Sequence, residues 1–207
     1  MFNSITDTAQ TERVPKSSPP WVWVGFLFAG AFFFMEVLFV VLELDEVAIT
    51  PFLMLIAVGG WIYFLVCVYK IHKIINEMAR DRYPISPGEA AAKHIIPFYN
   101  FYWLFKWPRE LSDYINRQGR VRIISGSVLG LMLLLSLLLR FFDGAIGLAF
   151  VFGVTMYISH KVKEHARTLQ GVTPDQLPPL PDPSIFSRPI ETAISPAQGV
   201  AEDSRAG

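Results

Sequence analysis

The sequence contains a single cysteine and few charged residues for its length. Cys67 has no second thiol to form an internal disulfide with, and a lone cysteine excludes Cys-x-x-Cys redox and zinc motifs. Asp, Glu, Lys and Arg make up 17% of the 207 residues, whereas an ordinary soluble domain carries about a quarter. The net charge is zero, so the composition gives no general attraction to nucleic acid, and we expect no nucleic-acid partner.

The sequence also lacks the common short motifs of enzymes. We find no P-loop, no dinucleotide-binding glycine pattern, no His-Glu-x-x-His and no Gly-x-Ser-x-Gly. His160 and His165 are five residues apart and do not share a helix face, so they predict no metal site. We therefore predict no catalytic residue, no metal and no cofactor, and a non-enzymatic protein is favoured, although motif absence does not exclude a membrane enzyme.

Apolar residues are abundant and occur in long blocks. They make up 52% of the chain, which includes 17 Phe and 5 Trp, and the mean hydropathy is +0.38. Such blocks predict an all-α polytopic membrane protein, because lipid leaves the edges of strands without hydrogen-bond partners. Four transmembrane helices are expected, at residues 21–42, 50–71, 121–142 and 144–159.

The blocks divide the chain into two tails and one membrane domain. We expect a flexible N-terminal tail at 1–20 and a transmembrane helical domain at 21–170. The domain includes a cytoplasmic or interfacial segment at 72–120. The Pro-rich stretch at 171–207 predicts a disordered C-terminal tail, because it has too little apolar surface to fold.

The basic residues predict the orientation in the membrane. Residues 43–49 contain no Lys or Arg, and the C-terminal flank of the last span carries three. The positive-inside rule then places both termini and the central segment in the cytoplasm, with an even number of spans. The central segment holds ten basic residues: Lys70, Lys73, Arg80, Arg82, Lys93, Lys106, Arg109, Arg117, Arg120 and Arg122.

The central segment carries further helix signals. Four residues spaced as one helical stripe extend span two: Ile71, Ile74, Ile75 and Met78. Ser86-Pro87-Gly88-Glu89 is a typical helix start with a capping box, and Pro97 is expected to bend or end that helix. Seven of the ten residues at 98–107 are aromatic, which predicts a break at headgroup level with Tyr102, Trp103 and Trp107 at the interface. A further short helix is expected to begin at Pro108.

Residues 89–105 could also form a fifth span. The stretch contains Lys93, His94 and Pro97, and basic residues flank it on both sides. A full crossing would place one basic cluster outside the cell. We therefore favour amphipathic or re-entrant cytoplasmic helices, and the choice between spanning, re-entering and lying at the interface remains open.

Residues 85–117 resemble a motif of uncharacterised bacterial multi-pass membrane proteins. The similarity lies in Ile85-Ser86-Pro87-Gly88-Glu89-Ala90 and in Ile96-Pro97-Phe98-Tyr99-Asn100-Phe101-Tyr102-Trp103, followed by Asp113-Tyr114-Ile115-Asn116. Some of those proteins carry a GYF-like domain, for which residues 1–20 are too short. The resemblance implies a bacterial inner-membrane protein and transfers no catalytic residue.

Several polar or aromatic residues are candidates for function. Glu36 within span one could couple a proton or ion, or pair structurally with Arg140. His94 beside Lys93 could bind a phosphate headgroup or form an interfacial polar pair, and Asn100 could cap backbone groups. The candidate functional or lipid-facing residues are Glu36, Lys93, His94, Pro97, Asn100, Tyr102, Trp103 and Trp107.

Small residues predict how the last two spans pack. Gly126 and Gly130 form a GxxxG motif, and Ala145, Ala149 and Gly153 repeat small side chains in the next span. We expect these positions to join spans three and four, with dimerisation through the glycines as the alternative.

Three functions are compatible with these features, and the third is a lipid-modifying enzyme that would need a polar cluster of His94, Asn100 and Glu110 near the cytoplasmic face. The favoured one is a membrane-interaction or scaffold protein that uses its basic, aromatic cytoplasmic face. Its partners would be the lipid bilayer and either anionic lipid headgroups or another membrane protein. The alternative is a small transporter or channel that uses Glu36, and it would require a homo-oligomer because four short spans enclose little.

Overall fold

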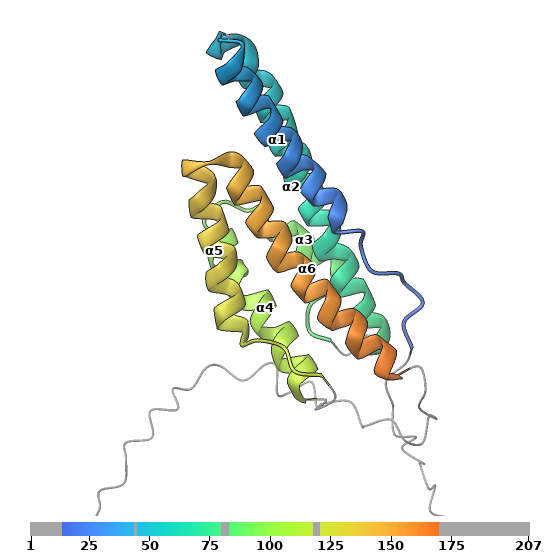
Figure 1. Cartoon of the computed structure of the whole chain (residues 1–207). Coiled ribbons are helices and arrows are strands. Elements are labelled where there is room, and N and C mark those ends of the chain that lie inside the picture. Colours follow the sequence, from blue (N-terminus) through green and yellow to red (C-terminus); the bar gives the residue numbers. More distant parts are fainter. Residues whose placement is uncertain (1–13, 44, 80–82, 118–120, 170–207) are drawn as a thin grey trace, which may run out of the picture.

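The computed structural model describes residues 14–43, 45–79, 83–117 and 121–169 of the chain. All regular secondary structure in these ranges is helical, which confirms the all-α class. Figure 1 shows the arrangement. The helices are α1 (Trp23–Val41), α2 (Glu46–Met78), α3 (Pro87–Ala92), α4 (Tyr99–Arg117), α5 (Gly126–Phe142) and α6 (Gly144–Leu169).

Three of these helices are long and apolar enough to cross a membrane. They are α1, α2 and α6, and each contains a strongly hydropathic stretch with few charges. Helix α5 is equally apolar but has only 17 residues, about 26 Å at 1.5 Å per residue. The hydrocarbon core of a bilayer is about 30 Å thick, so α5 is slightly short for a full crossing.

The two long antiparallel hairpins differ in height. The α1–α2 hairpin extends well beyond the α5–α6 hairpin at the upper end of Figure 1. A side chain at Gly144, the first residue of α6, would collide with the ring of Phe32, which is the middle residue of α1. The α5–α6 turn therefore lies beside the midpoint of α1, and the upper half of the α1–α2 hairpin projects past it.

Helix α2 is much longer than one membrane crossing. Its 33 residues extend about 50 Å, roughly 20 Å more than the hydrocarbon core. The predicted apolar stripe lies in its lower part and is almost completely buried, from Ile71 to Met78. The sequence therefore predicted this helical continuation correctly. The stripe was expected to lie against lipid headgroups or a partner, and the structure instead buries it within the chain.

The start of α3 also agrees with the sequence. The amide of Glu89 donates to Oγ of Ser86, and Pro87 occupies the first helical position. Helix α3 ends at Ala92, and the chain turns before α4 begins at Tyr99. The prediction of a new helix at Pro108 is wrong, because α4 runs without interruption through that residue.

Helix α4 continues through Pro108 at the place where the backbone of α4 contacts α5. A side chain at Gly126 would lie 2.1 Å from Cα of Arg109, and one at Gly130 would lie 3.0 Å from the carbonyl oxygen of Leu104. That carbonyl is the one that Pro108 leaves without a helical amide donor. The GxxxG motif therefore packs α5 against α4 rather than against α6, and α4 occupies the face that the dimer alternative requires.

The N-terminal segment is attached to α2. The backbone amides of Lys16 and Ser17 donate to a carboxylate oxygen of Glu77 at 2.7 and 2.8 Å, and the Ser17 hydroxyl donates to the other oxygen. The predicted flexible tail therefore has a fixed attachment at these two residues. The rest of that tail up to residue 13, and the predicted C-terminal tail at 171–207, lie outside the described residues.

Candidate functional site at the α3–α4 hairpin

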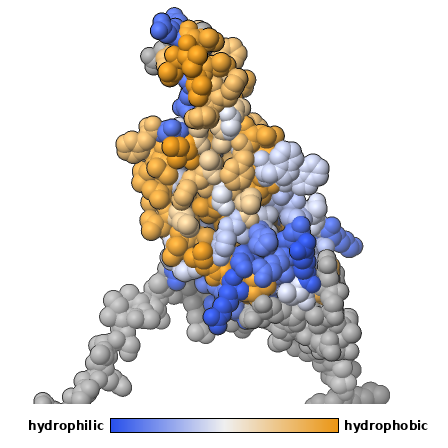
Figure 2. All heavy atoms as spheres, viewed as in Figure 1, coloured by the Kyte–Doolittle hydropathy of each residue, from blue (hydrophilic) through white to orange (hydrophobic). Residues whose placement is uncertain are grey.

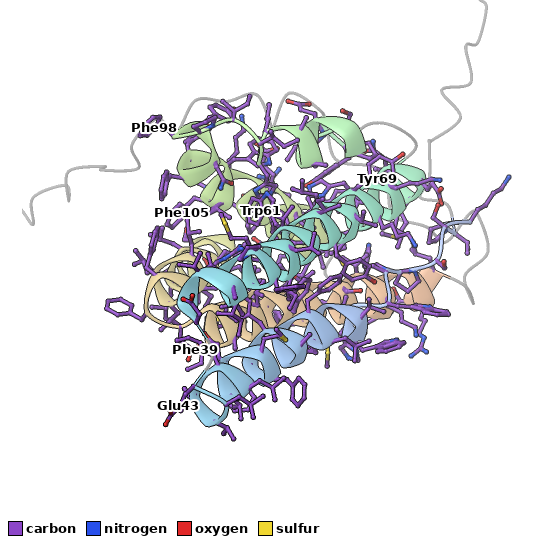
Figure 3. All side chains as sticks on the ribbon, turned by 90° about the horizontal axis from the view of Figure 1, so that it is seen from above. Phe39, Glu43, Trp61, Tyr69, Phe98 and Phe105 are labelled. Carbon is purple, nitrogen blue, oxygen red and sulfur yellow. The ribbon has the colours of Figure 1, made fainter. Side chains whose placement is uncertain are left out.

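The turn between α3 and α4 exposes large apolar side chains. Ile95, Ile96 and Phe98 are 67%, 51% and 87% exposed. Phe98 has a positive φ of 60°, a strained conformation for an aromatic residue, and the chain reverses direction there. Figure 3 shows its side chain at the outer edge of the hairpin, pointing away from the other helices. We call these three residues the apolar tip.

Trp103 and Trp107 do not face the lipid interface as the sequence predicted. Both side chains have no exposed surface, and the indole N–H of Trp103 donates to the backbone oxygen of Ala90 at 2.9 Å. Buried aromatic rings on one side of α4 hold it against the rest of the protein. Of the three predicted interfacial residues, only Tyr102 is exposed.

His94 is a buried, neutral member of this site. Its Nδ1 donates to Oδ1 of Asn100 at 2.7 Å, so Asn100 serves the imidazole rather than the backbone. Burial lowers the pKa of His94 to about 4, an effect only partly opposed by the hydrogen bond to Asn100. The ring packs against Phe64 and Trp107 at centroid distances of 5.2 and 6.2 Å, and its Nε2 has no hydrogen-bond partner among the described residues.

A second histidine, His72 of α2, was missed by the sequence analysis. Its imidazole is fully buried, donates from Nδ1 to the carbonyl of Val68 at 2.9 Å, and packs on Trp107 at 5.4 Å. Tyr83 packs on its other side at 5.8 Å. The sequence did contain a signal for this residue. His72 lies on the side of the helix that carries the apolar stripe, and a polar residue at such a position enters the core.

This cluster leaves several buried polar atoms without partners among the described residues. They are Nε2 of His72, Nε2 of His94, Nε1 of Trp107 and the hydroxyl of Tyr83. Burial, together with the charges of Glu110 and Asp113, raises the pKa of Tyr83 well above its usual value, so its hydroxyl stays protonated. Ordered water is the usual partner of such groups in a protein interior.

The two lysines of α3 and α4 are occupied locally. Lys93 pairs with Glu89 and lies over the ring of Trp103 at 4.4 Å. Lys106 lies 3.7 Å from the carboxylate of Glu110. These partners neutralise the lysines that the sequence offered for lipid headgroups. Arg109, in contrast, is exposed on the outer side of α4.

Glu36 and Arg140 do not form the ion pair considered from the sequence. No carboxylate among the described residues lies within ion-pairing distance of Arg140, which instead donates from Nη2 to the carbonyl of Ala57 at 3.2 Å. Glu36 is partly exposed on α1 and lines neither of the two clefts found in the described part of the chain.

The geometry of the described residues contains no group of three or more His, Cys, Asp or Glu side chains able to hold a metal. The α3–α4 hairpin instead combines a buried polar and aromatic interior with an apolar tip. Comparison of the chain with protein-family models, curated proteins and solved structures finds no match.

Proposed function

We propose that this chain is a bacterial inner-membrane protein that organises anionic lipid at its cytoplasmic face, without enzymatic activity. The apolar tip of the α3–α4 hairpin carries the proposal, since three large exposed side chains at one turn need an apolar environment. In this arrangement the hairpin enters the bilayer beside α5 and returns, with α5 as a fourth membrane helix. The turn itself is exposed, but the amides of Ile95 and Asn100 donate to the carbonyls of Ala92 and Ile96, which reduces the unpaired backbone that would enter the bilayer.

The distribution of charge supports the orientation. The first and last described residues lie at the lower end of the molecule, opposite the turn that carries Glu43 and Asp45 (Figure 1). Figure 2 shows apolar residues over the upper part of the molecule and hydrophilic residues gathered toward the lower end. Both termini are then cytoplasmic by the positive-inside rule. The exposed cations that would meet anionic headgroups include Lys70, Lys73, Arg109, Arg122, Lys163 and Arg167.

Lipid enrichment around the reconstituted protein tests this function. Energy transfer from the protein to labelled phosphatidylglycerol or phosphatidylcholine, in bilayers that contain both lipids, reports which lipid surrounds it. Replacing Lys70, Lys73, Arg109 and Arg122 by Gln is expected to remove the preference for phosphatidylglycerol, since each cation near the surface contributes about 1 kcal/mol. Lys93→Gln with Lys106→Gln is the matched control and should change little, because both lysines are already paired. Equal enrichment of the two lipids around the unaltered protein would contradict the proposal.

A further inference from the structure

An apolar groove lies between α5 and α6, which run side by side in Figure 1. Leu129 and Met132 of α5 and Phe150 and Gly153 of α6 form its walls. Its volume is about 490 Å³, which is typical of sites that bind small molecules. We propose that the groove binds one acyl chain of an anionic phospholipid from the cytoplasmic leaflet, with the phosphate beside Arg122.

The groove is bounded at both ends and opens beside Gly153. At the upper end Gly147 lies against α5, where an added side chain would be 2.6 Å from Cα of Arg140. At the lower end the backbone amide of Ile124 donates to the hydroxyl of Tyr157 at 3.1 Å. Between these contacts a side chain at position 153 would meet no atom within 4 Å. Gly153 therefore does not pack on α5 as the sequence predicted, and the space beside it is free for a ligand.

The depth of the groove matches one leaflet of a bilayer. Its upper end lies near the α5–α6 turn, beside the midpoint of α1, and Tyr157 marks its lower end. The eleven residue steps from Ile146 to Tyr157 rise about 16 Å, close to half of a hydrocarbon core that is about 30 Å thick. An acyl chain that enters from the cytoplasmic headgroups would fill the groove and end near the midplane, while its headgroup stays at the interface.

The lower end of the groove offers groups that suit a phosphate. Val121 and Ile123, in the segment before α5, are buried. Arg122 and Ile124 alternate with them and are exposed, so the guanidinium is on the side of the chain that lines the groove. Arg122 forms no ion pair with another described residue. The hydroxyl of Tyr157 accepts the amide of Ile124 and can still donate its own proton.

The surroundings of the groove favour a lipid over a second copy of the chain. Val128, Ile146 and Met156 are 45%, 53% and 53% exposed, so the surface near the groove is apolar. An apolar surface that ends in one cation at the interface matches the two parts of an anionic phospholipid. A symmetric dimer through the groove would instead bring two unpaired Arg122 side chains to the same interface, where like charges repel.

This inference rests on the cytoplasmic orientation proposed above, but it concerns a different population of lipid. Enrichment around the protein arises from several exposed cations, whereas the groove holds a single molecule through close packing along its chain. If the unaltered protein retains no lipid while phosphatidylglycerol is still enriched around it, this inference fails and the proposed function stands. The reverse result would reject the proposed function alone.

Native mass spectrometry of the full chain, with dioleoyl phosphatidylglycerol added in detergent, counts the lipid that stays bound. We expect one retained lipid on the unaltered protein and its loss in Gly153→Leu, because the leucine side chain fills the groove. Gly30→Leu is the matched control and should keep the lipid, since a side chain at this position of α1 also meets no atom within 4 Å. Arg122→Gln should weaken the affinity for phosphatidylglycerol about fivefold, the contribution of one cation near the headgroups, and leave phosphatidylcholine binding unchanged.

Three results would overturn the inference. They are retention of the lipid in Gly153→Leu, an equal loss in Gly30→Leu, and a dimer mass that disappears in Gly153→Leu, which would assign the groove to a second copy. If Gly153→Leu does not fold, Ile146→Trp decides the matter. Ile146 lines the groove and is 53% exposed, so a larger side chain there should block the groove without disturbing the core, and a retained lipid would refute the site.

Discussion

In α1, 11% of the most apolar stretch is buried inside the protein, whereas the corresponding share in α6 is 50%. Both helices are long and apolar enough to cross a membrane, but among the described residues only α2 lies beside the part of α1 beyond the α5–α6 turn (Figure 1). Its side chains at Phe33, Phe34 and Val40 point outward. We expect lipid, rather than protein, to cover this part of the molecule.

The lower part of the bundle depends on contacts within the protein. Every buried polar or charged residue of the described chain belongs to α2 below its midpoint, to the α3–α4 hairpin, to α5 or to α6, and none belongs to α1. The difference teaches that one chain combines two kinds of stabilisation. The upper hairpin resembles a simple membrane anchor, and the lower layer resembles the core of a globular protein.

Removing a buried indole from the lower layer should produce the largest effect on stability. Trp103→Ala leaves a cavity and an unpaired carbonyl at Ala90, which should lower the free energy of unfolding by about 4 kcal/mol. Tyr102→Ala, one position earlier and 55% exposed, should change it by less than about 1 kcal/mol. Thermal unfolding in detergent measures both. Equal effects would mean that α4 is not packed as a core helix.

Acid should weaken the lower layer through His94. The folded protein holds the pKa of this histidine at about 4, whereas the unfolded chain has the ordinary value of 6.5. Between these values the unfolded state binds more protons, so stability falls as the pH drops from 6.5 to 4 and the loss is complete below that range. The full contribution is about 3 kcal/mol.

Variants at two histidines isolate this contribution. The difference in stability between pH 7 and pH 4 should shrink in His94→Gln, since glutamine carries no titrating group. His160→Gln, at an exposed position of α6, should keep the pH dependence of the unaltered protein. An unaltered slope in His94→Gln would show that another group carries the acid sensitivity.

Glycine substitutions sharpen the contrast between crowded and lipid-facing helix surfaces. Gly126→Ala forces α5 away from the backbone of α4 and should destabilise by about 2 kcal/mol. Gly30→Ala meets no atom within 4 Å on α1 and should be neutral or stabilise by up to about 1 kcal/mol, because alanine favours the helix. Chemical unfolding in mixed micelles compares them. A destabilised Gly30→Ala would indicate a protein partner on the upper hairpin.

The smallest effect is expected at the N-terminal attachment. Glu77→Ala removes the acceptor for both backbone amides, at a cost of about 1 kcal/mol because the site is partly exposed. Hydrogen exchange at Lys16 and Ser17 should accelerate, while exchange in α4 should not change. Unchanged exchange at these two amides would show that the carboxylate does not hold the segment.

Local signals in the sequence predicted local structure well. Ser86 and Glu89 form the expected helix start, and the residues from Ile71 to Met78 continue α2 as one apolar helical stripe, as their spacing indicated. In both cases the physical cause lies within one helix. Hydropathy likewise indicated membrane-crossing helices, and three of them, α1, α2 and α6, have the required length. How deeply the fourth, α5, enters a bilayer depends on its neighbours and on the lipid.

The errors concern partners that are distant in sequence. Pro108 reads as a helix start, because nothing nearby shows that Gly130 would cover the carbonyl that the proline leaves free. Gly126 was likewise expected to contact the following helix, α6, because nothing near it in the sequence shows that α4 packs there. Trp103 reads as an interfacial residue until α3 supplies the carbonyl that binds its indole. Periodicity shows that a face is packed but does not identify what packs on it.

The placement of the α3–α4 tip in the bilayer is the central claim, and one reporter tests it most directly. In a chain with Cys67→Ser, a fluorescent label at Phe98→Cys is compared with one at Arg109→Cys. We predict that nitroxide groups on the lipid chains quench the label at position 98, and that iodide added to the cytoplasmic side quenches only the label at 109. Quenching at position 98 by cytoplasmic iodide, or its labelling by an impermeant reagent from the opposite side, would contradict the account.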